Sequence, residues 1–307
     1  MKKKILALIL ACAMILALAA CSGSANTEQP AAENTASDAA EAPAASEETA
    51  ASAEGKTYTV GVCQLVQHEA LDAATQGFCD ALTEALGDAV TIDVQNASGD
   101  SVNCGTIVNG FVSKNVDLIM ANATPALTAA ASATADIPIL GTSITAYGVA
   151  LDIADFSGTV GGNISGTSDL ADLSAQAQMI LDWFPETQKV GLLFCSAEPN
   201  SRYQIEEVAK YLADKGVETE EFAFTDTNDV ASVTQSAADY SDVVYIPTDN
   251  TAAANTEAIG NVLIPAGVPA ICGEEGICRG CGVATLSISY YDLGVTTGKM
   301  AAKILTG

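Results

Sequence analysis

Polar residues with little charge follow nearly every predicted strand of this sequence, and these side chains are best placed to bind a ligand. Hydroxyls and amides at helix N-termini suit a carboxylate, because free N–H groups and the helix dipole point at it. An acid such as Asp249 on a facing element suits an ammonium group. Together these features favour a zwitterion such as an amino acid. The candidate ligand-binding residues are Gln64, His68, Asn122, Thr124, Ser143, Asn200, Asp249, Asn250 and Glu274.

Helix capping is the alternative role for several of these candidates. Asn200, Asp249 and Asn250 are good N-cap residues, and capping alone would explain each of them. The hypothesis of a binding site therefore rests on the repetition of polar strand ends rather than on any single residue.

Catalysis is not indicated by the motifs. His68 is the only histidine, and neither GxSxG nor HExxH occurs, which leaves no obvious triad or zinc hydrolase. We therefore expect a protein that is not an enzyme and that carries no cofactor or metal.

Strands and helices alternate along the chain, and they are the elements that would position the polar residues. Such alternation predicts parallel sheets, with the ligand crevice beyond the carboxyl ends of the strands. The glycines of the loop Ser157–Ser168 indicate hinge backbone with unusual φ and ψ angles. The predicted strands are Thr57–Leu65, Val90–Gln95, Val116–Met120, Ile137–Gly141, Lys189–Phe194, Val217–Phe222, Val243–Ile246, Pro269–Cys272 and Val283–Ser289. The predicted helices are Ala70–Leu86, Val102–Lys114, Pro125–Thr134, Leu170–Phe184, Ser201–Lys215, Val230–Tyr240, Thr251–Leu263 and Tyr291–Leu305.

Two consecutive series of this kind predict an α/β fold with two Rossmann-like lobes joined by a hinge. We expect residues 57–143 with 288–307 to form the first lobe, and residues 144–287 the second.

The N-terminal residues differ in composition from the rest. Three lysines precede an apolar run from Ile5 to Ala20, and Leu18-Ala19-Ala20-Cys21 resembles a bacterial lipobox. We expect residues 1–21 to be a lipoprotein signal peptide and Cys21 to carry the lipid; the alternative is an uncleaved apolar helix. Residues 22–56 are rich in Ala, Ser, Glu, Thr and Pro and are predicted to be a disordered tether. These features predict a lipid-anchored protein on the extracellular face of the cell membrane.

The net charge and the cysteines limit the partners and metal sites that we expect for this protein. The formal net charge of −26 at pH 7 disfavours nucleic acid, because an acidic surface repels phosphate backbones. Cys278 and Cys281 form a lone CxxC, for which loop thiols, a small local disulfide, no role and a metal site are all open. A zinc site would normally need a second ligand pair.

Several stretches resemble the substrate-binding proteins of ABC transporters related to tryptophan- and tyrosine-binding lipoproteins. They are GVCQLVQHEALDAATQGF, DLIMANATPA, GGNISGTSD, SAEPNS, VVYIPTDN and ATLSISYYDLG, which together span most of Thr57–Gly307. The resemblance implies a type I periplasmic-binding fold, a cleft between lobes and, in several members, an aromatic amino acid ligand. It implies as cleft residues Gln64, His68, Asn122, Thr124, Asn200, Asp249 and Asn250.

The sequence departs from that family at two places. Thr145-Ala146-Tyr147 replaces the usual T-D-P-like turn, which changes the expected shape of the pocket. Relatives continue past the position of Gly307, so we expect a C-terminal segment to be missing.

The resulting hypothesis is an extracytoplasmic solute-binding lipoprotein, monomeric, that delivers an amino acid-like ligand to an ABC permease and ATPase complex. The alternative is a lipoprotein that senses a ligand and presents it to a receptor. An α/β enzyme is the third reading, because fold alone does not determine function.

Overall fold

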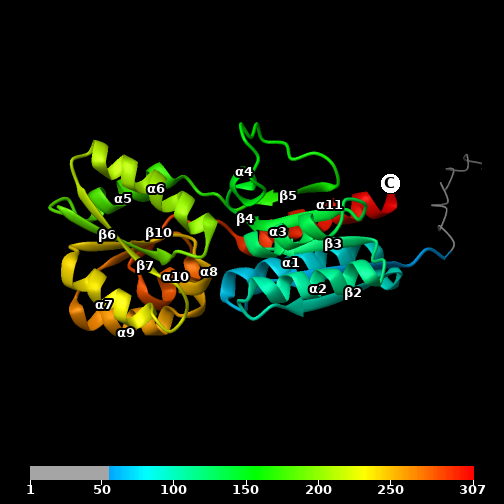
Figure 1. Ribbon diagram of the computed structural model, residues 1–307, viewed down its shortest axis with the longest axis horizontal. Helices are drawn as coiled ribbons and strands as arrows, with labels where there is room; N and C mark the ends of the chain where they lie inside the picture. The colour runs from blue at the N-terminus through cyan, green and yellow to red at the C-terminus, as the bar shows by residue number, and fades with distance from the viewer. Residues whose placement is uncertain (1–54) are drawn as a thin grey trace, which may run out of the picture. The chain divides into compact units, whose positions relative to one another are not determined.

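The computed structural model of the protein describes residues 55–307, which all belong to one unit of the chain (Figure 1). The predicted signal peptide, Cys21 and nearly all of the tether lie outside the described residues. Within residues 55–307, no helix is long and apolar enough to cross a membrane.

The first sheet has five parallel strands in the order β2-β1-β3-β4-β5. Its strands are β1 (Tyr58–Gln64), β2 (Val90–Asn96), β3 (Leu118–Asn122), β4 (Ile139–Ile144) and β5 (Ile164–Ser168). The helices that follow them are α1 (Glu69–Leu86), α2 (Ser101–Ser113), α3 (Thr124–Ala133) and the short α4 (Tyr147–Ala150), with a 3-10 turn at Gly87–Ala89.

Both faces of the first sheet are buried, because β1 and β3 are apolar at successive positions. On β3, Leu118 and Met120 belong to the cluster that includes Phe78 of α1, while Ile119 belongs to the cluster on the opposite face that includes Phe111 of α2. Continuous apolar runs of this kind are typical of central strands in parallel sheets.

The second sheet also has five parallel strands, in the order β10-β9-β8-β6-β7. Its strands are β6 (Lys189–Cys195), β7 (Glu218–Phe224), β8 (Val243–Ile246), β9 (Ala270–Cys272) and β10 (Ala284–Thr285). The helices are α5 (Leu173–Trp183), α6 (Pro199–Asp214), α7 (Val230–Tyr240), α8 (Asn250–Ala254), α9 (Thr256–Ala266) and α10 (Glu275–Cys281).

The predicted fold class is therefore confirmed: two α/β lobes, each built on a five-stranded parallel sheet. The boundary predicted at residue 143 differs from the structure, because β5 pairs with β4 and so belongs to the first sheet. The prediction assigned these residues to a hinge loop. Gly161 and Gly162 do have positive φ angles, of 83° and 61°, but they lead into β5. The predicted helix Thr251–Leu263 is two helices, and α10 was not predicted.

The last helix, α11 (Tyr290–Thr306), returns to the first lobe, where it packs on α1 and contacts β4 and β5 (Figure 1). Glycines allow the two helices to approach closely. A Cβ atom at Gly294 would lie 2.0 Å from the carbonyl oxygen of Ala74, and one at Gly77 would lie 2.1 Å from that of Tyr291. The position of the C-terminal helix therefore depends on these positions having no side chain.

Gly294→Ala tests this close contact. Because the methyl group would overlap backbone atoms, which cannot move aside like a flexible side chain, we expect a loss of about 1–3 kcal/mol in the free energy of unfolding. Gly110→Ala in α2 is the matched control, since nothing lies within 4 Å of the added Cβ. The control should be neutral or stabilising by up to about 1 kcal/mol. Equal stability of the two variants in urea titrations would contradict the proposed helix contact.

Candidate ligand-binding site

The residues that follow the strands of both sheets meet at one small cavity between the lobes. Parallel strands end at the same edge of a sheet, so the loops after β1, β4, β6, β8 and β9 are brought together there. The cavity is lined by His68, Leu71, Ser143, Thr145, Asp169, Asn200, Thr248, Asp249, Asn250, Ala253, Glu274 and Tyr290.

The cavity is too small for an amino acid in this conformation. Its volume is about 10 Å³, which is barely the room that one water molecule needs. Small-molecule pockets are commonly about 300–1,000 Å³. A ligand of amino-acid size can therefore enter only when the two lobes move apart.

Unpartnered polar atoms concentrate at this cavity. Among residues 55–307, seven buried side-chain nitrogen or oxygen atoms have no hydrogen-bond partner, and four of them belong to cavity residues. The four are His68 Nδ1, Ser143 Oγ, Asp169 Oδ1 and Asn200 Oδ1. An unpaired buried polar group typically costs about 1–3 kcal/mol, so their convergence indicates a site that polar ligand groups would complete.

Asp169 is the acid of the cavity with a free oxygen. It follows β5 and is 4% exposed, with Oδ2 accepting a hydrogen bond of 2.8 Å from the Tyr290 hydroxyl and Oδ1 left unpartnered. Burial is the main cause that raises the pKa of this carboxyl above its usual value. A cationic group beside Oδ1 would offset the penalty of burying the charge.

Both carboxylate oxygens of Asp249 accept hydrogen bonds from the protein's own backbone. Its Oδ2 accepts from the backbone N–H of Cys195 and its Oδ1 accepts from that of Ala252, both at 2.7 Å. Burial first, and then repulsion from Glu198, raise the pKa of Asp249 to about 7. This arrangement favours the helix-cap alternative for Asp249, although the residue does line the cavity.

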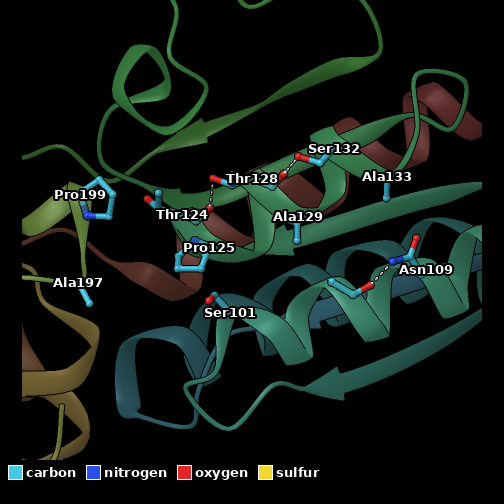
Figure 2. A pocket seen from close by; sticks show the side chains of 11 residues that line it. Ser101, Asn109, Thr124, Pro125, Thr128, Ala129, Ser132, Ala133, Ala197 and Pro199 are labelled. Carbon is cyan, nitrogen blue, oxygen red and sulfur yellow. Dashed lines mark hydrogen bonds between the residues drawn. The ribbon is translucent and has the colours of Figure 1, made fainter. Parts of the chain in front are cut away.

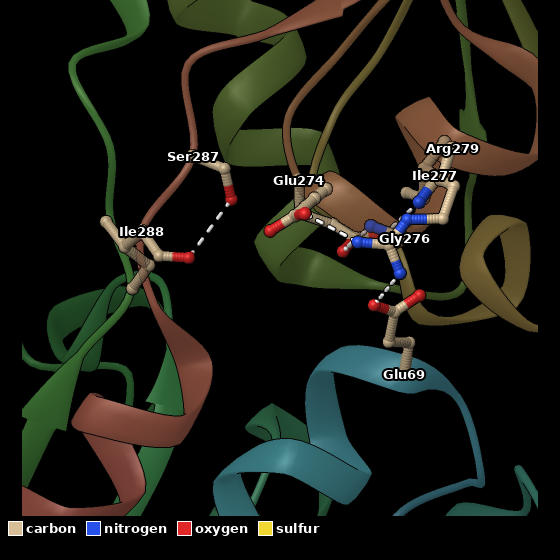
Figure 3. Close-up of polar contacts among 8 residues, drawn as sticks. Glu69, Glu274, Gly276, Ile277, Arg279, Ser287 and Ile288 are labelled. Atoms are coloured by element: carbon tan, nitrogen blue, oxygen red, sulfur yellow. Dashed lines mark hydrogen bonds and ion pairs between the residues drawn. The ribbon is translucent and has the colours of Figure 1, made fainter.

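The other two acids near the cavity are also occupied. Glu198 accepts five hydrogen bonds, from the side chain of Asn200 and from the backbones and side chains of Asn250 and Thr251. Glu274 caps α10 by accepting from the backbone N–H groups of Gly276 and Ile277 (Figure 3). Burial raises the pKa of Glu274. Neither carboxylate offers a free oxygen comparable with that of Asp169.

His68 joins the two lobes at the cavity. It is the N-cap residue of α1, and its Nε2 lies 3.3 Å from Oδ1 of Asn250 at the start of α8. Burial lowers the pKa of the imidazole, which favours the neutral ring. The side chain makes no capping bond, so the first N–H groups of this 18-residue helix have no side-chain partner from the cap.

Ser143 has a strained backbone, with a φ angle of 55° next to a register irregularity between Gly141 and Ile144 of β4. A bulge changes the direction in which a side chain points, and a positive φ angle at a residue other than glycine is a strain that functional sites can retain.

Three predicted site residues do not reach the cavity. Gln64 bonds instead to Asp72 and Thr75 of α1, each at 2.6 Å. Asn122 donates to the backbone oxygen of Leu71 at 2.9 Å. These two amides therefore hold α1 against β1 and β3, where they position its N-terminus.

Thr124 lies in a different hollow, a groove of about 460 Å³ that includes residues of α2 and α3 (Figure 2). Its walls are small or uncharged residues, among them Ser101, Pro125 and Ala129. The structure thus brings six of the predicted residues to the cavity: His68, Ser143, Asn200, Asp249, Asn250 and Glu274.

Sequence reasoning placed Thr145 and Thr248 among the polar strand ends, but it missed Asp169 and Tyr290 as cavity residues. Asp169 escaped notice because β5 was not predicted, so its place at a strand end was hidden. The stretch GTSD contained the signal, because the acidic residue Asp169 ends it shortly before the next helix.

Comparisons with known proteins agree with this geometry. The family model described as ABC transporter substrate binding protein matches residues 59–307, and the chain belongs to that family. Its two lobes have the type I periplasmic-binding fold. A tyrosine-binding protein of Clostridioides difficile is 33% identical over 255 residues, which cover 82% of this chain and 74% of that protein.

Two solved structures allow the conformation of this chain to be compared with a ligand-bound and an open relative. An ABC domain from Streptococcus pneumoniae in complex with L-Trp is 32% identical, with a TM-score of 0.78, and covers 82% of this chain and 86% of that chain. A ligand-free, open substrate binding protein with adhesive properties from Clostridium difficile is 33% identical with the same coverages, but its TM-score is 0.60. At equal identity, this chain is therefore closer in conformation to the ligand-bound relative than to the open one.

The buried acids predict how stability depends on pH. An acid whose pKa is higher in the folded protein than in the unfolded chain binds its proton more tightly when folded, so stability falls as the pH rises between the two values. Asp249, with a pKa of about 7, Asp169 and Glu274 all act in this direction. We therefore expect the melting temperature of the ligand-free protein to fall as the pH rises from about 4.5 to 7.

Calorimetry across this range checks the expectation. Acids with a lowered pKa, such as the partly buried Asp93, oppose the trend only below about pH 4. His68 opposes it up to about pH 6.5, because burial lowers the pKa of its imidazole and the folded protein favours the neutral ring. The three acids together are expected to outweigh this single histidine. Asp169→Asn should reduce the slope, because one titrating group is removed. A slope that is the same in Asp169→Asn as in the wild type would show that the carboxyl of Asp169 is not protonated more easily in the folded state, because the contribution of His68 is common to both proteins.

Proposed function

We propose that this protein is an extracytoplasmic solute-binding lipoprotein that captures an amino acid between its lobes and delivers it to an ABC permease. The ligand class is an amino acid with an aromatic side chain. Support for that class comes from the printed ligands of two relatives, tyrosine and L-Trp, at 33% and 32% identity. Support for the lipid anchor comes from the lipobox-like residues that end at Cys21.

The position of the ligand's ammonium group is inferred from one observation, the unpartnered oxygen of Asp169. The Oδ1 atoms of Asp169 and Asn200 are unpartnered acceptors on the same cavity, and an ammonium group donates up to three hydrogen bonds. Asp169 thus takes the role that the sequence suggested for Asp249, whose oxygens are both engaged.

The carboxylate of the ligand is assigned to the hydrogen-bond donors of the cavity. Ser143 Oγ can donate a hydrogen bond, and so can His68 Nδ1 in the matching tautomer. The uncapped N-terminus of α1 begins directly after His68 and stabilises negative charge there. The cavity therefore offers acceptors for the ammonium group and donors for the carboxylate.

Capture by closure follows from the contacts between the lobes. His68 and Asn250 meet across the cavity, and Arg279 of α10 forms an ion pair with Glu69 at the start of α1 (Figure 3). Both contacts exist only when the two lobes are together. Because the cavity is small, the lobes must separate before a ligand can enter it. A ligand that bridges the two lobes shifts this equilibrium toward the closed form.

Asp169→Asn tests the assignment directly. We expect L-tryptophan or L-tyrosine to bind the wild type in isothermal titration calorimetry. The variant should lose at least about 30-fold in affinity, because the partner of a buried cation is removed. The ligand-free variant should melt at a higher temperature than the wild type, because an unpaired buried carboxylate is no longer present.

The matched control is Asp226→Asn, which removes the same charge from an exposed position beside the cleft. It should bind within about twofold of wild type. If Asp169→Asn binds as tightly as the control, the ammonium group lies elsewhere. If neither aromatic amino acid nor any other amino acid binds the wild type, the proposed ligand class is wrong.

Arg279→Gln tests the contribution of the ion pair to closure. The side chains of Arg279 and Glu69 are 58% and 51% exposed, so the pair is weakened by water and we expect less than about a fivefold loss of affinity. Small-angle scattering of the ligand-free variant should show a larger radius of gyration than wild type. Lys210→Gln removes a cation that pairs with Glu207 of the same helix, and it should change neither quantity. An unchanged radius of gyration for Arg279→Gln would remove the ion pair from the closing mechanism.

A further inference from the structure

Three thiols lie together at the end of β9 and on α10, outside the ligand cavity. Cys272 is the last residue of β9, while Cys278 and Cys281 are on α10, and all three are free. Cys272 and Cys281 are buried, whereas Cys278 is half-buried and can meet a reagent from solution.

The close approach of Cys272 and Cys278 depends on Gly282. A Cβ atom built on Gly282 would lie 2.4 Å from Cys272 Sγ and 3.0 Å from the Cα atom of Cys278. The sulfur of Cys272 and the backbone of Cys278 therefore flank the same point, which places the two thiols close enough for each to shift the pKa of the other. Such proximity allows a disulfide to form with only a small displacement.

Cys278 combines this proximity with partial exposure and a lowered pKa. The neighbouring thiol of Cys272 is the main cause that lowers the pKa of Cys278, to about 7. A thiol with a lowered pKa has a larger thiolate fraction at neutral pH than an ordinary cysteine, and the thiolate is the nucleophile. Among the described residues, no group of three or more His, Cys, Asp or Glu residues is arranged to hold a metal ion.

A second thiol contact, between Cys63 and Cys104, lacks this accessibility. The two thiols shift each other's pKa, but both residues are fully buried in the core of the first lobe. Oxidant therefore has no direct path to them while the protein is folded.

We propose that Cys278 and Cys272 form a reversible disulfide, which makes the β9–α10 segment a site of thiol–disulfide exchange. The Cys278 thiolate attacks one sulfur of a small-molecule or protein disulfide, whose other sulfur leaves as a thiolate. Cys272 then attacks the sulfur of Cys278, and its proton passes to the second departing thiolate. The two cysteines are oxidised by two electrons, and the disulfide reagent is reduced to two thiols.

The segment that this bond closes is part of the ligand-binding lobe. It contains Glu274, which lines the cavity and caps α10, and it ends beside Arg279, whose side chain reaches Glu69. Oxidation would therefore attach α10 covalently to β9 next to the contacts that close the cleft.

Trypsin distinguishes the possible disulfides cleanly. Lys215 and Arg279 are successive cleavage sites, so Cys272 and Cys278 lie on one peptide, residues 216–279, and Cys281 lies on the next, residues 280–299. After treatment of the folded protein with oxidised glutathione, mass spectrometry should show the 216–279 peptide with two hydrogen atoms fewer. Dithiothreitol should restore the original mass.

Alkylation provides an independent readout. At pH 7, iodoacetamide should modify Cys278 at least about ten times faster than Cys79. Cys79 is the matched control, because it is also half-buried but burial raises its pKa. Cys278→Ser should abolish the internal disulfide, and Cys281→Ser should leave it intact. A disulfide that joins the two peptides, or a 216–279 peptide that keeps both hydrogen atoms under oxidation, would overturn the proposal.

Discussion

The buried carboxylate of Asp169, with one oxygen left without a partner, is the constraint on which the account of this protein depends. A charge in such a place is unfavourable for the ligand-free closed form and becomes favourable only when a cation arrives. Burial of this carboxyl beside a cavity with almost no volume explains its raised pKa. The unpaired oxygen therefore lowers the stability of the ligand-free protein and favours the binding of a cation, a trade-off that is common at functional sites.

The fold supplies the position of that charge. Parallel strands send their carboxyl ends to one edge, so two sheets facing each other at these edges surround a ligand with loop residues from both lobes. Gln64 and Asn122 hold α1 against the first sheet, while Glu198 accepts hydrogen bonds from Asn250 and Thr251 at the start of α8. These amides and acids order the loops, which leaves few polar groups free to meet the ligand.

The sequence predicted most of the fold because central parallel strands are continuous apolar runs separated by helices of ordinary length. It predicted β8 and α7 with the bounds that the structure has. The sequence did not predict β5 (Ile164–Ser168), which has only one large apolar residue. It also could not show that both carboxylate oxygens of Asp249 accept hydrogen bonds from backbone N–H groups. The bond from Ala252 is the local helix cap that the sequence offered as an alternative, whereas the bond from Cys195 is a tertiary contact between residues 54 positions apart.

The most direct test of the central claim is an experimental structure of the protein with the amino acid that calorimetry identifies. The account predicts that the ligand's ammonium nitrogen lies within about 3 Å of Asp169 Oδ1, with its carboxylate at Ser143 and the start of α1. An ammonium group bound to Asp249 instead, with Asp169 still lacking a partner, would contradict it.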